Sequence, residues 1–277
     1  MDTFLFVVIF TIILIIYLHI MDELKKSSNL EIYEIDYKNN DKLQEIASLK
    51  QPFVFTLNNV YLENENETNI ELKVKDVEKK YNEYVSLSLS AVTKLMDTDK
   101  KSRYYTENNN EYAYDKYSDF YKKLNYYLKP NFTVNSEYDY LFGSLGAYTP
   151  FRYHMYSRCF IYSESGTVQI RMVPWKYEKE MKVIIDNTEM EYYSNVDLWE
   201  EEHKNIKYID FYLNEGSYLY IPAFWFYSIK YKENSEIFSL KYQTPANLLI
   251  NLPKYFLKYL QNDNTTLNVF KKIKLNN

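Results

Sequence analysis

The longest uninterrupted hydrophobic run lies at the amino terminus. It is TFLFVVIFTIILIIYLHIM, residues 3–21, without a formal charge apart from the titratable His19. As a helix with a rise of about 1.5 Å per residue, this run spans about 28 Å, which is enough to cross the hydrocarbon core of a bilayer. A cleaved signal peptide would show a basic segment before the run and small residues at a cleavage site, and neither is present. The run therefore predicts an uncleaved transmembrane anchor.

A short polar joint, residues 22–29, separates this anchor from the rest of the chain. The pattern after it predicts a strand at LEIYEIDY (30–37), a helix at NDKLQEIASLK (40–50) and a second strand at QPFVFTL (51–57). We expect Asp41 to be the N-cap of the helix, because a short polar side chain can accept the free N–H groups of the first turn.

The next part of the chain gives mixed signals. VKDVEKKYNEY (74–84) has the spacing of a helix, EYVSLSLSAV (83–92) alternates, and KSRYYTENNNEY (101–112) predicts an exposed loop. YDKYSDFYKKLNYYL (114–128) carries aromatic residues at helical intervals, and Pro130 ends this predicted helix.

From Tyr138 onward the pattern changes to short strands separated by turn residues. The predicted strands are FRYHMYSRCFIY (151–162, one strand or a pair of strands), TVQIRMVPW (167–175), KYIDFYL (207–213), YLYIP (218–222), FWFYSIKY (224–231) and EIFSLKYQT (236–244). Their spacing of roughly 8 to 12 residues indicates a β-sandwich or barrel rather than a parallel α/β sheet. A helical segment at 247–261, interrupted at Pro253, closes the domain, and residues 263–277 form a polar tail. We expect a mainly β fold with helical decoration behind one transmembrane helix.

Charge and cysteine content narrow the classes of function. Lys and Arg number 33 and Asp and Glu 38, giving a net charge of -5 with no basic block, so we expect no nucleic-acid partner. Cys159 is the single cysteine, which excludes an intramolecular disulfide and a multi-cysteine zinc site and favours a reducing compartment. Lys25 and Lys26 follow the anchor and no Lys or Arg precedes it, so the positive-inside rule predicts a single-pass membrane protein with its main domain in the cytoplasm.

The stretch TPFRYHMYSRCF, residues 149–160, has one polar and aromatic face. Strand side chains point alternately to opposite faces, so Arg152, His154 and Tyr156 share a side. An isolated histidine on a strand is most often a hydrogen-bonded structural residue, so the alternation alone does not define a functional site.

Three phrases of the β region resemble one family. TPFRYH (149–154), GTVQIRMVP (166–174) and GSYLYIPAFWFYSI (216–229) are similar to the cupin-like, JmjC-type oxygenase domain, and the last phrase is the most specific. The resemblance is closest to poorly characterised cupin-like proteins of large DNA viruses, many of which carry an N-terminal hydrophobic segment. It implies a double-stranded β-helix, a cupin jelly roll, over residues 30–262.

The same resemblance implies a lost metal site. The oxygenases hold Fe(II) with a histidine, an acidic residue two positions later and a distant histidine, which leaves coordination sites for 2-oxoglutarate and oxygen. These positions fall on Arg152, His154 and Tyr227, so only His154 could be a ligand, and arginine offers no lone pair. The lysine that grips the co-substrate falls on Val168, whereas Thr149 is kept. We therefore predict no catalytic residue, no metal and no cofactor.

A candidate binding pocket remains. By family position it would be lined by Thr149, Arg152, His154, Tyr156, Trp225 and Tyr227. A buried guanidinium needs a partner, which is either a carboxylate of the protein or an anionic ligand. Trp225 and Tyr227 are expected to pack the barrel, with stacking on a ligand ring as the lesser alternative.

Three functions follow from these observations. The first is a membrane-anchored cupin-like module that has lost oxygenase chemistry and binds or scaffolds, with a small anion as a candidate ligand. The second is a divergent Fe(II)/2-oxoglutarate oxygenase that uses His154 with ligands elsewhere in the chain. The third is a structural viral membrane protein. The sequence identifies no protein partner.

Overall fold

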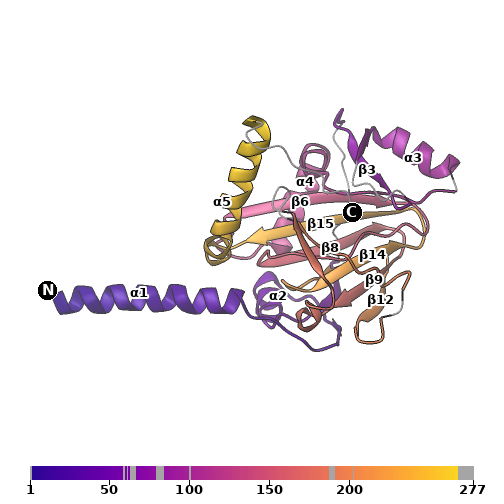
Figure 1. Ribbon diagram of the computed structural model, residues 1–277. Helices are drawn as coiled ribbons and strands as arrows, with labels where there is room; N and C mark the ends of the chain where they lie inside the picture. Colours follow the sequence, from indigo (N-terminus) through magenta and orange to yellow (C-terminus); the bar gives the residue numbers. More distant parts are fainter. Residues whose placement is uncertain are drawn as a thin grey trace.

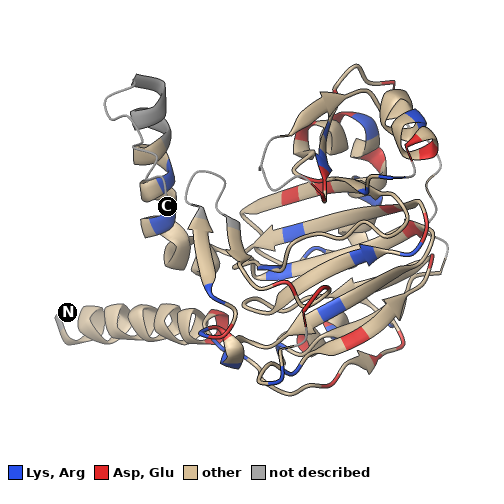
Figure 2. Cartoon of the chain, turned by 45° about the vertical axis from the view of Figure 1, so that its right-hand side comes forward, with Lys and Arg blue, Asp and Glu red and all other residues tan. Residues whose placement is uncertain are grey.

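The computed structural model describes residues 2–267 except 59, 61, 63–66, 79–83, 100, 187–190 and 202. The chain is mainly β-sheet with helices, as expected, and an apolar N-terminal helix, α1 (Asp2–Glu23), projects from the β domain (Figure 1). Within α1, Thr3–Glu23 is the only described segment long and apolar enough to cross a membrane. Figure 2 shows charged residues at the end of α1 that joins the domain, and residues 3–21 carry no Asp, Glu, Lys or Arg.

Two sheets make up the β domain. The larger has the strand order β1 (Tyr33–Glu34), β2 (Phe53–Thr56), β13 (Ser217–Tyr220), β8 (Arg158–Ser165), β15 (Ser235–Gln243), β6 (Asn135–Gly143), β5 (Tyr104–Thr106), β3 (Leu72–Asp76), β4 (Val85–Leu87). The smaller has the order β10 (Val183–Asp186), β11 (Glu191–Ser194), β7 (Arg152–Tyr153), β14 (Phe226–Tyr231), β9 (Val168–Val173), β12 (Ile209–Leu213). All described pairs are antiparallel except β1 with β2. Several pairs, such as β7 with β14 and β8 with β15, join strands that are distant in the chain.

The two sheets face each other across an apolar core. Alternate residues of the larger sheet, such as Ile161 and Ile237, meet Ile170, Met172 and Ile229 of the smaller sheet, and all are buried. This core is the reason that the strands alternate in the sequence, because each strand has one face in the core.

The opposite face of the larger sheet carries a layer of aromatic rings. Helices α2 (Asn40–Ala47) and α4 (Asn110–Leu128) cover it. Tyr121 of α4 stacks on Tyr138 with ring centroids 4.3 Å apart, and Tyr162 stacks on Tyr218 at the same distance. Much of the high tyrosine content is therefore packed in this layer, where aromatic rings bury large areas.

Several local predictions need correction. The N-cap of α2 is Asn39, whose side chain accepts the N–H of Lys42 at 2.9 Å, and not Asp41. The segment predicted as a helix at 74–84 begins inside strand β3, and its residues 79–83 lie outside the described part. The alternating segment 83–92 holds β4 but continues into helix α3 (Leu89–Thr98).

Two further corrections concern buried polar residues and proline. The stretch 101–112, predicted to be an exposed loop, contains strand β5 and the buried Glu107 and Asn109, because β5 is hydrogen-bonded between β3 and β6. Helix α5 (Pro245–Leu267) runs through Pro253 without interruption. It also extends past residue 262, and residues 268–277 of the predicted tail lie outside the described part.

The predicted joint is packed against the domain. Glu23, at the end of α1, is buried, lies 3.5 Å from the ammonium group of Lys50 and accepts hydrogen bonds from the hydroxyls of Ser157 and Thr244. Ser27 accepts a hydrogen bond from the indole of Trp225 at 2.9 Å. The last turn of α1 is therefore fixed to the ends of several strands.

Candidate functional site

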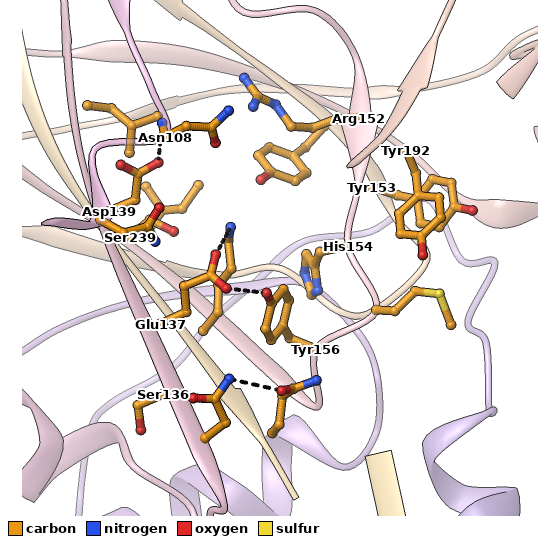
Figure 3. A pocket seen from close by; sticks show the side chains of 18 of the residues that line it. Asn108, Ser136, Glu137, Asp139, Arg152, Tyr153, His154, Tyr156, Tyr192 and Ser239 are labelled. Atoms are coloured by element: carbon orange, nitrogen blue, oxygen red, sulfur yellow. Dashed lines mark hydrogen bonds and ion pairs between the residues drawn. The ribbon is translucent and has the colours of Figure 1, made fainter. Parts of the chain in front are cut away.

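A polar cavity of about 400 Å³ opens between the two sheets. Its lining comes from β6 and β15 on one side, from β7, β14 and the segment 154–156 on the other, and from α5 at one end (Figure 3). Four residues of the predicted pocket meet here: Arg152, His154, Tyr156 and Tyr227. The alternation of the segment FRYHMY thus places its polar face toward the cavity.

Arg152 has an internal partner. Its guanidinium donates to the carboxylate of Glu107, a residue with no exposed surface, and Glu107 also pairs with Lys75 at 2.9 Å. Burial alone would raise the pKa of Glu107, but Arg152 and Lys75 outweigh it and hold this pKa at about 2. The ionised Glu107 therefore compensates the charge of Arg152. Of the two partners expected for this guanidinium, a carboxylate of the protein or an anionic ligand, the structure contains the carboxylate.

His154 is a neutral imidazole inside the cavity wall. The side chain is 6% exposed, and burial, with the nearby charge of Lys241, lowers its pKa to about 3. Its Nε2 lies 3.1 Å from the carbonyl oxygen of Ile221, so Nε2 carries the proton and Nδ1 is left as an acceptor. Among the described residues Nδ1 has no hydrogen-bond partner.

Tyr156 belongs to a hydrogen-bonded trio with Glu137 and Lys241. The phenol donates to Glu137, and the ammonium of Lys241 lies 3.2 Å from the same carboxylate (Figure 3). Burial raises the pKa of Glu137, but Lys241 and Tyr156 outweigh this effect and the net pKa is lowered. Lys241 stays charged, because Glu137 raises its pKa against the opposing effect of burial.

Asp139 completes the other wall. Figure 3 shows it across the cavity from His154. Its carboxylate accepts the backbone N–H groups of Asn108 at 3.0 Å and Asn109 at 2.7 Å. Burial raises the pKa of Asp139, and these backbone donors act in the opposite direction.

Sequence reasoning missed this second wall. Glu137 and Asp139 alternate along β6, and Ser239, Lys241 and Gln243 alternate along β15. The alternation of polar residues in these two segments could have predicted that they share one face of a strand, because strand side chains point alternately to opposite faces. The pairing of β6 with β15 then sets these two polar rows beside each other.

Two residues of the predicted pocket lie elsewhere. The hydroxyl of Thr149 is buried and accepts the N–H of Ile229 at 3.0 Å, and Thr149 lines a separate hollow of about 220 Å³. Trp225 is fully buried against the joint through Ser27. Both side chains have structural contacts that account for them.

The side chains at the family's metal positions do not fit an iron ion. Arg152 and Tyr227 are register partners on β7 and β14, but Arg152 is a cation paired with Glu107, and burial raises the pKa of the Tyr227 phenol to about 12. Only His154 could donate a lone pair. Within the described residues there is no group of three or more His, Cys, Asp or Glu side chains placed to hold a metal.

Comparison with known proteins does not assign the chain to a family. No protein-family model matches the chain, and no curated protein sequence is significantly similar to it. The cupin-like assignment therefore depends on the three sequence phrases and stays an expectation.

Proposed function

We propose that this protein is a membrane-anchored binding module that takes a small anion into the cavity between its sheets, without the iron chemistry of the oxygenases. The observation that carries the proposal is the charge of the cavity wall. Its charged lining residues in the described part of the chain are Lys73, Arg152, Lys241, Lys258, Glu137 and Asp139, an excess of two positive charges. Glu107 and Lys75 behind the wall add one charge of each sign, so the excess is unchanged.

A polar cavity with surplus positive charge favours carboxylate or phosphate groups. Arg152 is paired with the fully buried Glu107. Lys241 is paired with Glu137, but this pair itself lines the cavity and the ammonium has further N–H groups to donate, so Lys241 and Lys258 are the cations that would meet such a group. The neutral His154 would add an acceptor for a hydroxyl of the same ligand. The ligand that fits is therefore a small hydroxylated carboxylate or phosphate.

The proposed fold is the double-stranded β-helix of the cupins. Two observations support it: antiparallel sheets that enclose a cavity, and Arg152 opposite Tyr227 on neighbouring strands, at the positions where the family holds iron. The proposed location is a membrane crossed once by α1, with the β domain on the cytoplasmic side.

Anion binding is tested by thermal unfolding of the full chain in detergent micelles. We expect inorganic phosphate or 2-oxoglutarate, without added metal, to raise the unfolding temperature above that in chloride at equal ionic strength, because a ligand that binds only the folded state stabilises it. Lys241→Gln and Lys258→Gln should each abolish or weaken the shift. Lys122→Gln, on the exposed face of α4, is the matched control and should keep it.

Two results would overturn the proposal. One is no shift with either anion, which would favour a structural role. The other is an equal shift in all three lysine variants, which would show general ion effects. Lys258 is only partly buried, so its variant reports on binding even if Lys241→Gln fails to fold.

Anaerobic loading with Fe(II) separates the proposal from the oxygenase alternative. We expect no stoichiometric iron in the purified full chain after desalting, because the described residues contain no group of three or more His, Cys, Asp or Glu side chains placed to hold a metal around the neutral His154. Stoichiometric iron together with succinate formation from 2-oxoglutarate would establish the oxygenase instead.

A further inference from the structure

Helix α5 is amphipathic, but its apolar face points away from the domain. The exposed apolar side chains described on this helix are Leu249 (47%), Leu252 (49%), Phe256 (61%), Leu257 (49%), Tyr259 (63%) and Leu260 (46%). At 100° per residue these six positions fall on one side of the helix, in an apolar stripe about 160° wide. A helix on a soluble domain turns such a stripe inward, so this orientation needs a separate explanation.

The inward face of α5 is polar. Asn247 and Asn251 are buried, and the amide of Asn247 donates to the carbonyl oxygen of Met155 at 2.7 Å. Asn251, Tyr255 and Lys258 line the cavity. The polar side thus closes one end of the cavity while the apolar side is left uncovered within the described chain.

The anchor fixes the direction in which this apolar stripe points. Thr244, one residue before α5, donates to Glu23 of α1 at 2.7 Å and also accepts the N–H of Asn247 at 3.3 Å. The end of α1 and the first turn of α5 are therefore joined through one hydroxyl. In Figures 1 and 2 α5 runs across the direction of α1, on the side of the domain from which α1 leaves.

Neighbouring apolar side chains are exposed around the same end of the domain. Phe132 is 87% exposed, in a turn whose Val134 N–H donates to Gln243, two residues before α5. Leu49 is 58% exposed and precedes Lys50, the partner of Glu23. The segment of Phe132 is thus hydrogen-bonded next to the start of α5, and the segment of Leu49 is ion-paired with the end of α1.

We propose that α5 lies on the bilayer surface, with Leu252, Phe256 and Leu260 in the boundary between headgroups and acyl chains. The inference rests on the proposed membrane anchoring, because a helix perpendicular to a spanning α1 is parallel to the membrane plane. Amphipathic helices bind this boundary through their apolar face. Since Lys258 and Tyr255 line the cavity from α5, this end of the cavity stands at the membrane surface, where anionic headgroups or soluble anions can reach it.

The test is fluorescence quenching in phosphatidylcholine vesicles that contain the full chain. Single-cysteine variants in a Cys159→Ser background carry an environment-sensitive label at Phe256→Cys, at Ile13→Cys in α1, or at Tyr212→Cys. Tyr212 is the matched control, an aromatic 58% exposed on β12, away from α5 (Figure 1). Lipids with a spin label near the headgroup should quench position 256, lipids with a deep spin label should quench position 13, and neither should quench position 212.

The outcomes distinguish failure of this inference from failure of the proposed membrane anchoring on which it rests. An unquenched label at position 256 with a quenched label at position 13 would overturn the membrane contact of α5 and leave the anchor intact. An unquenched label at position 13 would overturn the anchor itself. Disulfide cross-linking between Phe256→Cys copies, without lipid quenching, would assign the stripe to a second copy of the chain and also overturn the proposal.

Discussion

A buried carboxylate determines what Arg152 can do. Glu107 is fully buried and shared by Arg152 and Lys75, so removing either cation would leave buried charge without full compensation. Arg152 therefore contributes to the stability and shape of the cavity wall, whereas Lys241 and Lys258 line the cavity and would contact the proposed anion.

His154 makes the stability of the domain depend on pH. The pKa of His154 is lowered to about 3 in the folded chain, whereas an unfolded histidine titrates near 6.5, so below this value the unfolded state takes up the proton first. Stability from the neutral imidazole is thus complete above pH 6.5 and is lost as the pH falls toward 3. Between pH 7 and pH 5 we expect a loss of about 2 kcal/mol in the free energy of unfolding, measured by urea denaturation.

The control for this dependence is a pair of histidine substitutions. His154→Gln removes the titrating group, so its stability should change much less between pH 7 and pH 5. His203→Gln, in the half-exposed segment before β12, should lose as much free energy of unfolding between pH 7 and pH 5 as the unmodified chain. An undiminished loss in His154→Gln would contradict the assignment.

The sequence indicated one wall of the cavity and not the other. Arg152, His154 and Tyr156 alternate within five residues, so local periodicity brings them to one face. Glu137 and Lys241 are 104 residues apart, and only the pairing of β6 with β15 joins them. Such a contact leaves no local signal, so a single sequence could not predict the partner of either residue.

At the scale of elements, α2 is tied to the larger sheet through a tyrosine on β13. The hydroxyl of Tyr220 donates to the carbonyl oxygen of Ala47 in the last turn of α2, at 3.0 Å. Tyr218 is also buried on β13, and its hydroxyl has no hydrogen-bond partner among the described residues. The two tyrosines thus differ in bonding while sharing a strand and an aromatic layer.

We expect Tyr220→Phe to lower the free energy of unfolding by about 1 kcal/mol, because it removes the buried hydrogen bond to Ala47 and leaves this carbonyl oxygen with the N–H of Lys50 as its remaining donor. Tyr218→Phe should change it by less than about 0.5 kcal/mol, because no bond is lost. Urea denaturation of both variants measures the difference. Equal losses would show that packing of the rings, rather than the bond to α2, accounts for Tyr220.

Element predictions succeeded where the pattern was long and failed where polar residues are buried. The aromatic spacing of 114–128 and the alternation of 167–175 predicted α4 and β9. The Asn-rich stretch 101–112 failed because composition indicates exposure, whereas Asn109 there is buried and bonded to the carbonyl oxygen of Tyr140 at 2.9 Å. Burial of a polar side chain follows from its tertiary partner, which local pattern does not contain.

At the scale of the molecule, the charge flanking α1 predicts which side of the membrane holds the domain. A membrane-impermeant maleimide should label Tyr212→Cys, in the Cys159→Ser background, on sealed microsomes without detergent, because the positive-inside rule predicts that the segment after Lys25 and Lys26 stays on the cytoplasmic side. A variant with Thr3→Lys, Lys25→Glu and Lys26→Glu reverses the charge bias and should need detergent for labelling. If Tyr212→Cys with the natural charges around α1 is labelled only after detergent is added, the domain lies on the lumenal side and the prediction is wrong.

The burial of Glu23 has a consequence for how far the protein can reach. Many anchored domains are joined to their transmembrane helix by a flexible linker, so they can move through a large volume above the membrane. Here the last turn of α1 is bonded to Ser157 and Thr244, so an α1 that spans the membrane, as proposed, would hold the domain at a fixed height and tilt. In that proposed location the domain would meet only ligands that diffuse along its own patch of membrane, and its rate of encounter would follow their two-dimensional density.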